Sequence, residues 1–335
     1  MKRLIYLLAL IQLSCSNQQK VDVSNIDINY DIIRYDSLLF AKNVNNYNTY
    51  FNEIAQSHKA FTKVFCENIY SLGKVNKDSF NLSKELTYLV TNPDMQNLFK
   101  ETQVINNDLQ LQLNTLNQSL KYFKYHFPEI NTPDIYLYNG KFEYAAIVGQ
   151  NFIGIAMEMC LGNKNTYIRQ SGIPNYISRK LNLAHMPVHV MQNLIQSNFL
   201  QQSKSNLLDF MIYKGKVLYC LDAMLPGIND SLKIGYADEK IEWCQDNENE
   251  IWSWMLKHEL LFNTQKMEFM KYVMDGPNTA GMPYEAPGNI ASWLGWQIVS
   301  AYMEKHPNTS LKDLMLLPAL QKGQVILNKS GYKPR

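Results

Sequence analysis

The sequence predicts an α+β fold that is mainly α-helical and contains one small β-sheet. Two stretches with helical spacing of apolar residues, 31–130 and 175–335, flank a short β-rich stretch at 133–162. The 335 residues, 46% of them hydrophobic and 19% charged, are enough for one large domain or two smaller ones. We expect a single globular domain over 31–335.

The N-terminus has the layout of a secretory signal. Lys2 and Arg3 precede an apolar run over residues 4–11. A basic start followed by a short apolar segment is typical of a signal peptide, whereas a membrane-spanning helix needs about 20 apolar residues. The run is too short to span a membrane, and we expect it to direct export.

The end of this signal carries a candidate lipidation site. The small residue Ser14 directly precedes Cys15, an arrangement that resembles the bacterial lipobox, in which the cysteine is acylated and becomes the new N-terminus. Gln12 departs from the aliphatic residue that the lipobox usually has there, and a non-lipidated secretory signal is the alternative. We expect 1–14 to be the lipoprotein signal peptide and Cys15 the anchor.

The polar residues that follow look like a short tether. No acidic cluster comes directly after Cys15, and the first strongly apolar segment begins near residue 31. We expect 15–30 to connect the lipidated cysteine to the folded chain, with flexibility from Ser16 to about Val21.

The charge balance excludes one class of partner. Loss of Lys2 and Arg3 with the signal lowers the number of basic residues from 32 to 30, against 30 acidic ones. A nearly neutral chain without a clustered basic face does not have the electrostatics of a nucleic-acid-binding protein. We therefore expect no nucleic acid among the partners.

The remaining cysteines contain no C-x-x-C pair, so they do not form a typical metal or redox motif. We expect buried free thiols. An exported protein can also form disulfides, and four cysteines allow three pairings that the sequence does not rank. These residues are Cys66, Cys160, Cys220 and Cys244.

The first helical part, 31–130, opens with "IIRYDSLLF" at 32–40 and reads as three or more packed helices. Its last helix is the clearest, because apolar residues recur every three or four positions until Pro128. They are Leu109, Leu113, Leu116, Leu120, Phe123 and Phe127.

The stretch 133–162 predicts two or three short strands. Ile135 and Leu137 alternate with other residues before an Asn139-Gly140 turn, and a β-rich run follows at 152–157.

The second helical part returns to helical spacing. Trp293 and Trp296 belong to an apolar stripe in its long helix near the C-terminus, which we interpret as core. The expected helices are 187–200, 206–225, 241–262, 265–275 and 289–305.

The segment "LAHMPVHVMQNLI" at 183–195 raises the question of a zinc site. His185 and His189 have the spacing of the two ligands in H-E-x-x-H, the motif that offers two imidazoles to Zn²⁺ from one helix face. Met186 stands where the general base should be. Pro187 favours a helix that begins after His185, so we expect the two rings not to share one face.

A third ligand is also missing. In gluzincin-like peptidases the next helix carries Glu followed by Gly, whereas Lys214 precedes Gly215 here. A protonated lysine has no lone pair for zinc, and its charge opposes the metal. A second partial motif, "KHELLF" at 257–262, closes with phenylalanine, and we interpret its His258 and Glu259 as one face of an amphipathic helix.

Four blocks of sequence, taken in order, resemble the family of gliding-motility lipoproteins called GldB over nearly the whole chain. The blocks are "IIRYDSLLF" at 32–40, "LLDFMIYKGKVLYCLDAMLP" at 207–226, "KIGYADEKIEWCQDNENEIW" at 233–252 and "EAPGNIASWLGWQIVSAYMEKHP" at 285–307.

The resemblance implies a fold, a site and a location. The family is similar to predicted zinc peptidases, which implies a gluzincin-like scaffold whose degenerate metal-site positions are His185, Met186, His189 and Lys214. It also implies a lipoprotein of the cell envelope, most simply in the outer membrane facing the periplasm. Its partners would be other envelope proteins of gliding or of the type IX secretion system that is linked to it.

Two functions of different classes compete. The leading hypothesis is a lipid-anchored, non-catalytic component of the gliding machinery, a partner-binding pseudo-peptidase with no cofactor, no metal and no catalytic residue. The alternative is an envelope zinc metallopeptidase with non-standard ligands, in which an acidic residue such as Glu158 or Asp222 completes the histidine pair.

Cys15→Ala should abolish acylation and leave the protein soluble or unprocessed. Acyl chains contribute roughly 0.8 kcal/mol per buried CH₂, so the long chains of a lipidated cysteine suffice for stable anchoring. Detergent-phase partition with immunoblot detection measures the effect. A variant that partitions into detergent with the wild type would contradict the lipoprotein prediction.

Overall fold

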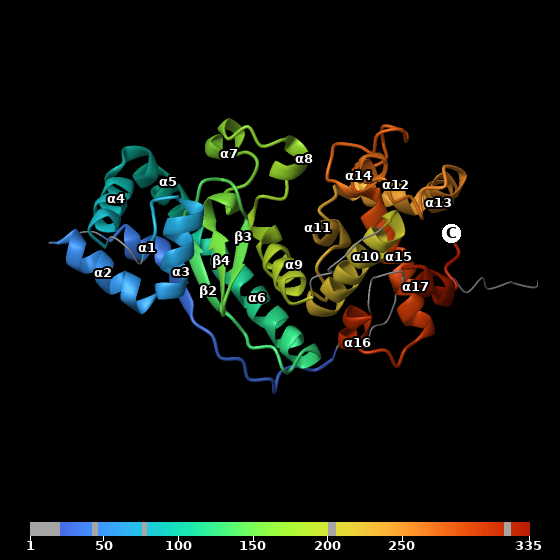
Figure 1. The fold of residues 1–335 in the computed structure, drawn as a ribbon, viewed down its shortest axis with the longest axis horizontal. Coiled ribbons are helices and arrows are strands. Elements are labelled where there is room, and N and C mark those ends of the chain that lie inside the picture. The colour runs from blue at the N-terminus through green and yellow to red at the C-terminus, as the bar shows by residue number, and fades with distance from the viewer. Residues whose placement is uncertain (1–20, 42–45, 76–78, 200–205, 318–322) are drawn as a thin grey trace, which may run out of the picture.

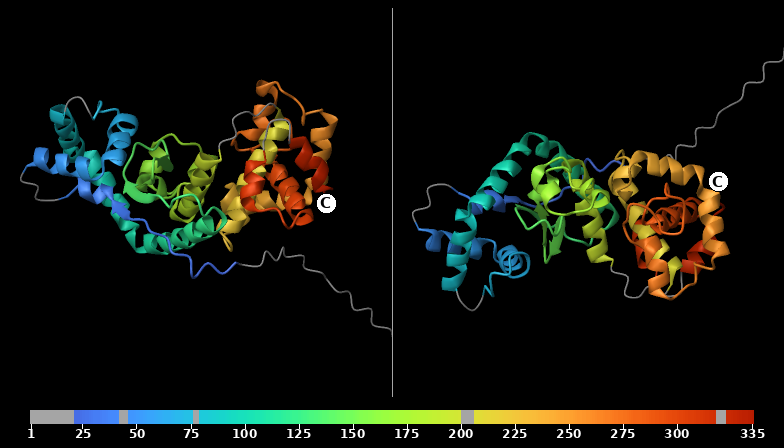
Figure 2. Two further views of the ribbon diagram at one scale, coloured as in Figure 1. Left: turned by 60° about the horizontal axis from the view of Figure 1, so that its bottom comes forward. Right: turned by 90° about the horizontal axis from the view of Figure 1, so that it is seen from above.

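The computed structural model describes residues 21–41, 46–75, 79–199, 206–317 and 323–335. Figure 1 shows a central sheet with helices α1 to α5 at one end of an elongated molecule and α10 to α17 at the other. The two further views in Figure 2 show the same division. The fold is therefore mainly helical with one small sheet, which confirms the predicted α+β class.

The sheet has four short strands in the order β1-β2-β4-β3. β1, β2 and β4 run parallel, and β3 pairs antiparallel with β4 at the edge. The strands are β1 Ile32–Arg34, β2 Asp134–Tyr138, β3 Ala146–Gly149 and β4 Phe152–Ala156.

The two faces of the sheet belong to two hydrophobic cores. On β2, Ile135 and Leu137 join one core while Tyr136 and Tyr138 join the other, as the alternation of side chains along a strand requires. The smaller core lies toward the N-terminal helices and is rich in rings; Phe61, for example, stacks on Tyr136 with 4.3 Å between ring centroids. The larger core continues through α6 and α9 into the C-terminal helices.

The N-terminal helices begin with local capping signals. Asn46 and Asn92 accept hydrogen bonds from the first free backbone N–H groups of α2 and α5, and Pro93 occupies the first turn of α5. The elements are α1 Tyr35–Leu39, α2 Tyr47–Ser57, α3 Lys59–Val64, the π-helix η1 Phe65–Ile69, α4 Ser79–Thr91, α5 Pro93–Val104 and α6 Asn106–His126.

After the sheet the chain is helical again, first through η2 Met157–Cys160, α7 Thr166–Gln170, α8 Asn175–Ser178, η3 Leu183–His185 and α9 Met186–Asn198. The C-terminal helices are α10 Leu207–Met224, α11 Asp230–Ile234, α12 Asp238–Asp246, α13 Glu248–Lys257, α14 Lys266–Val273, α15 Ile290–Lys305, α16 Leu311–Leu316 and α17 Gly323–Ser330. Trp293 and Trp296 are buried in the larger core, as predicted. No helix in the described part of the chain is long and apolar enough to cross a membrane.

The structure corrects three expectations. The sheet has four strands, because β1 lies in "IIRYDSLLF", where a helix was expected; three residues are too few for a periodicity, and pairing with β2 fixes them as a strand. The helix expected at 241–262 is two helices, α12 and α13. Asn247 separates them: its backbone, with φ of −117°, leaves the helical region, and both its N–H and its side-chain amide donate to the carbonyl oxygen of Trp243.

The third correction concerns the tether. Residues 21–30 lie against the larger core: Val23 is buried, and the Tyr30 hydroxyl donates to Asn117 on α6. The segment is mostly polar, so its composition suggested a tether. Its few apolar side chains are nevertheless buried against the larger core. The expected signal peptide 1–14, the expected lipidation site Cys15 and the part of the expected tether before Val21 lie outside the described residues.

All four cysteines of the described residues are free and buried, as expected. Burial raises the pKa of each thiol, which keeps it in its protonated form.

The C-terminal half is organised by one close helix crossing. A side chain at Gly215 on α10 would overlap the carbonyl group of Gly295 on α15, and a side chain at Gly295 would overlap the carbonyl group of Met211. The two backbones touch because neither glycine carries a Cβ atom.

Gly215→Ala is expected to lower the free energy of unfolding by about 1–3 kcal/mol, the usual cost of overpacking a core. The loss should appear even though alanine favours an isolated helix over glycine by roughly 1 kcal/mol. Urea unfolding followed by circular dichroism measures it. The control Ser300→Ala, at a partly exposed position of α15, should change stability by less than about 0.5 kcal/mol. Equal stability of the two variants would show that the crossing is not tight.

Candidate functional site

A polar cavity of about 190 Å³ lies where the sheet-side helix α9 meets the C-terminal helices. Its wall comes from the turns before α9, from α9 and α10, from α11, and from the loop that leads into α15. The titratable residues that line it are Lys180, His185, His189, Lys214, Lys233 and Asp275.

The cavity brings together three of the four predicted degenerate positions, His185, His189 and Lys214. The imidazole rings of His185 and His189 are roughly parallel, with 6.1 Å between their centroids. The expectation that the two rings do not share a face was therefore wrong. The 3₁₀ turn η3 runs directly into α9, so His185 keeps helical backbone angles, and Pro187 lies in the first turn, where a missing N–H costs no hydrogen bond.

Hydrogen bonds fix how each imidazole carries its proton. The Asn182 side-chain amide donates to the carbonyl of Arg179, so its oxygen is the acceptor for His185 Nδ1 at 3.1 Å. His189 Nε2 donates to the carbonyl of Lys180 at 2.9 Å. Each neutral imidazole therefore donates its single N–H to a fixed acceptor.

Both imidazoles are held neutral. Burial, the neighbouring His189, Lys180 and Arg179 together lower the pKa of His185 to about 3. Burial also lowers the pKa of His189, against the opposing effect of its hydrogen bond to Lys180.

Lys180 and Asp275 form the ion pair of the cavity. The Lys180 ammonium donates to the Asp275 carboxylate at 2.5 Å, and the Asn289 side chain donates to the other oxygen of that carboxylate at 3.2 Å. Gly288 packs against the backbone of Gly276, so the two ends of the loop before α15 touch and hold Asp275 beside Asn289.

Met186 does not line the cavity. Its side chain is buried in the larger hydrophobic core. The position where the motif would place a general base therefore points into the core and away from the cavity.

The two acidic candidates for a third ligand are engaged elsewhere. The fully buried Glu158 accepts hydrogen bonds from the backbone N–H groups of Gly140 and Phe142, and burial raises its pKa to about 7. Asp222 accepts from Lys233 and from the indole N–H of Trp296, each at 2.7 Å. Neither carboxylate lines the cavity.

The residues of the cavity do not fit a zinc ion. Within the described ranges, no group of three or more His, Cys, Asp or Glu side chains is arranged to hold a metal. The ammonium of Lys214 lies on the wall where a ligand is needed, and zinc sites use three or four protein ligands.

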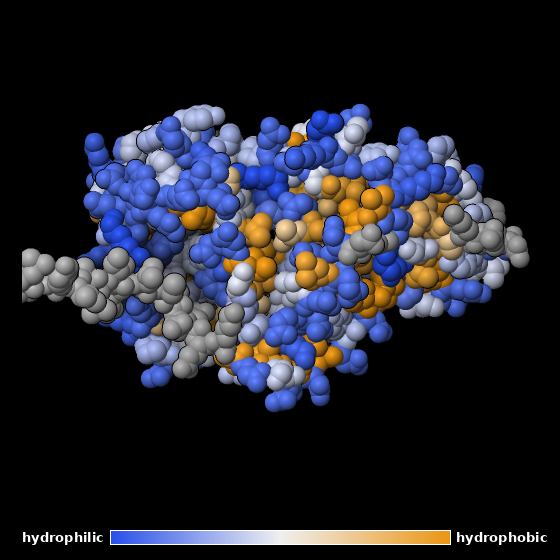
Figure 3. Space-filling view, turned by 180° about the vertical axis from the view of Figure 1, so that it is seen from behind, coloured by the Kyte–Doolittle hydropathy of each residue, from blue (hydrophilic) through white to orange (hydrophobic). Residues whose placement is uncertain are grey.

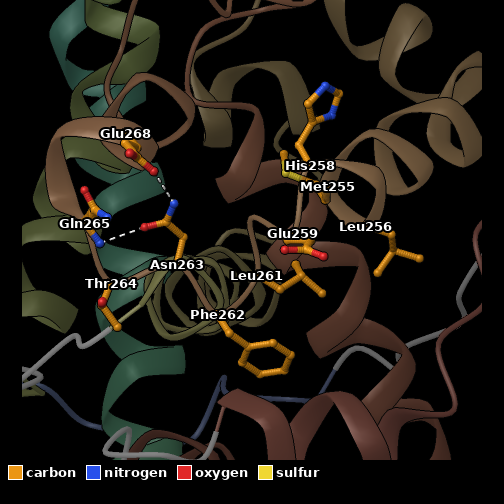
Figure 4. Close-up of a pocket in the computed structure, with 10 residues that line it drawn as sticks. All are labelled: Met255, Leu256, His258, Glu259, Leu261, Phe262, Asn263, Thr264, Gln265 and Glu268. Atoms are coloured by element: carbon orange, nitrogen blue, oxygen red, sulfur yellow. Dashed lines mark hydrogen bonds between the residues drawn. The ribbon is translucent and has the colours of Figure 1, made fainter.

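A second, wider groove of about 760 Å³ lies over the turn after α13 (Figure 4). The prediction that His258 and Glu259 lie on a helix face was wrong, because α13 ends at Lys257 and Glu259 has a left-handed backbone with φ of 53°. The Asn263 side-chain amide donates to the carboxylate of Glu268 at 2.6 Å. In Figure 4 this hydrogen bond lies on the side of the groove away from Glu259. The titratable groups do not converge, so this groove does not have the form of an active site.

Sequence reasoning missed Lys180, Lys233, Asp275 and Asn289. Lys180 and Asp275 are 95 positions apart in the chain, and nothing near either residue signals the pair. The one local signal is that Lys180 precedes His185 by five positions, so it had to lie near the start of α9.

The fold and the site define a mainly helical α+β protein with a basic cavity around a neutral histidine pair. The family model described as gliding motility protein GldB matches residues 16–334. The chain therefore belongs to the GldB family, whose members are envelope lipoproteins involved in gliding motility. No curated protein and no solved structure matches the chain.

The purified mature chain, residues 16–335, is expected to contain no stoichiometric zinc. Two neutral histidines without a third ligand, and with Lys214 beside them, make a poor site for a dication. Elemental analysis after mild dialysis is the measurement. A content of one zinc per chain would overturn this reading of the cavity.

Proposed function

We propose that the chain is a lipid-anchored, non-catalytic component of the gliding machinery that binds a partner protein of the envelope. In this proposal residues 31–335 form a single domain on a gluzincin-like scaffold that has lost its metal. The single observation that carries it is the composition of the cavity: His185 and His189 remain together, but Lys214 faces the same space and Met186 is packed in the core.

The location follows from the same reasoning. A signal peptide over 1–14 and a lipid on Cys15 would place the domain in the periplasm, held to the outer membrane. Family membership supports partners among the envelope proteins of gliding, and we extend this to the linked type IX secretion system.

The rear face of the molecule carries a mixed surface. Figure 3 shows apolar patches over the middle of the rear face, interrupted by polar and charged side chains. Such a mixed surface is typical of non-obligate interfaces, which are about as apolar as the rest of a protein surface.

One observation favours the second candidate, an envelope zinc metallopeptidase. The two imidazoles lie one helical turn apart and line the same cavity, as the first two ligands of an H-E-x-x-H site do. A ligand from Glu158 or Asp222 would have to leave its present hydrogen bonds to reach them.

Replacing both histidines should separate the two functions. The variant His185→Gln/His189→Gln keeps an amide N–H for each existing acceptor and is expected to support gliding, at a stability cost of about 1 kcal/mol per site. The shorter variant His185→Ala/His189→Ala is expected to behave alike if its fold survives. The peptidase alternative predicts loss of movement in both, because the metal that activates water is lost.

The measurement is colony spreading and single-cell movement, with protein amount checked by immunoblot. Deletion of the whole protein is the negative control and should stop gliding. Non-motile cells that contain normal amounts of the folded glutamine variant would refute the non-catalytic role.

A further inference from the structure

Lys214 is an ammonium group without a partner in the cavity. Within the part of the chain that the structure describes, it has no hydrogen bond and no ion pair, although it is only partly exposed. Burial lowers its pKa, and the attraction of Asp275 opposes that effect. The ammonium is not one of the fully buried polar atoms that lack a partner, so it is accessible to solvent and can meet an anion that enters the cavity.

The charges around Lys214 leave one positive charge uncompensated. Lys180 and Lys214 both act on a single carboxylate, that of Asp275, and Lys180 already holds it at 2.5 Å. Although burial raises the pKa of Asp275, the two lysines and the Asn289 hydrogen bond keep it below its ordinary value. The Asp275 carboxylate is therefore ionised, and each of its oxygens already accepts a hydrogen bond.

Around them, Lys233 and Arg179 carry two positive charges and Asp222 and Asp230 two negative charges, so these groups add no net charge. Lys233 is engaged by Asp222 at 2.7 Å and by Asp230 at 3.0 Å. His185 and His189 are neutral, since burial lowers the pKa of both. A ligand that brings one negative charge would balance the cavity, and a dianion would leave excess negative charge beside Asp275.

We propose that this cavity binds a carboxylate group, with the Lys214 ammonium as its ion-pair partner. Carboxylates pair with ammonium groups through short, charge-assisted hydrogen bonds. A volume of about 190 Å³ is below the range of about 300–1,000 Å³ that whole small-molecule ligands occupy, so it suits an end group such as the last residue of a peptide or a short organic acid.

This inference deepens the proposed function and rests on it, because a partner's terminal carboxylate would give the cavity its role. The two can fail separately. Binding of a small acid is measured on the purified protein and does not depend on gliding, whereas the histidine variants test the absence of metal chemistry in cells.

The test is calorimetric titration of the mature lipoprotein in detergent micelles with N-acetylglycine, at low ionic strength. N-acetylglycinamide is the matched probe without the charge, and inorganic phosphate is the dianion. We expect saturable binding of the acid, and binding about tenfold weaker or undetectable for the amide and for phosphate. Equal binding of acid and amide, or tighter binding of phosphate, would overturn the proposal.

Two variants make the assignment specific. Lys214→Met keeps an unbranched side chain of moderate length and should weaken N-acetylglycine binding about tenfold or more, because the ion pair is lost. Lys266→Met, an exposed lysine of α14 away from the cavity, is the control and should bind as the wild type does. Wild-type affinity in Lys214→Met, or an equal loss in Lys266→Met, would refute the role of Lys214.

Asp275→Asn keeps the test decisive if Lys214→Met does not fold. It removes the carboxylate that, among the described residues lining the cavity, competes for the two lysines, and it preserves the side-chain shape. N-acetylglycine should then bind about tenfold tighter, and phosphate should bind detectably. Unchanged affinity for both anions would show that the cavity does not select its ligand by charge.

A peptide probe identifies the source of the carboxylate. An N-acetylated tripeptide acid that binds more tightly than N-acetylglycine assigns the site to the C-terminus of a polypeptide. A weaker tripeptide assigns it to a short organic acid. Both results support a carboxylate site, and absence of binding by either acid refutes it.

Discussion

The close contact of α10 and α15 through Gly215 and Gly295 is the constraint on which the C-terminal half depends. Lys214 directly precedes Gly215, and α15 begins at the loop that carries Asp275 and Asn289, so the contact fixes the distance between two walls of the cavity. Further along, Asp222 of α10 accepts the indole N–H of Trp296, which adds a polar link between the same helices. Because backbones in contact cannot slide without a clash, the cavity is pre-formed.

The sheet plays the complementary role on the other side. Each face of the sheet packs into one of the two cores. Helix α9 packs against β3 and β4 with one side, and it presents His185 and His189 to the cavity with the other. Helix α9 therefore connects the sheet to the crossing, and Met186 and Val190 in the larger core hold it there. Packing of α9 and the hydrogen bonds to Asn182 and Lys180 hold the imidazole pair in position.

The sequence predicted the features that depend on long, regular patterns. The helix that ends at His126 and the stripe of Trp293 and Trp296 are examples, because a periodicity of 3.6 is clear over several turns. It did not predict β1, whose three residues become a strand only by pairing with β2, a partner about 100 positions away. Local pattern cannot show a contact that is formed by tertiary structure.

In the candidate site too, local patterns were predicted and tertiary contacts were not. Motif spacing located His185 and His189, and the family pattern located Lys214. Pro187 led to the wrong expectation for the two rings, since a proline in the first turn is compatible with a continuous helical backbone before it. Asp275 and Asn289 had no local signal, and Lys180 had only its place before the histidines, because a salt bridge across 95 positions depends on how the turns before α9 and the loop before α15 meet.

One lysine accounts for the chemical character of the cavity. A glutamate before Gly215 would have supplied a ligand and a negative charge to two imidazoles, a combination that attracts a dication. Lys214 instead supplies a positive charge at the same place; that charge opposes a metal, and together with Lys180 it outnumbers the single carboxylate of Asp275. A neutral histidine pair is compatible with such a field, because protonating either ring would add a further buried positive charge. The same scaffold position thus determines whether the cavity attracts a cation or an anion.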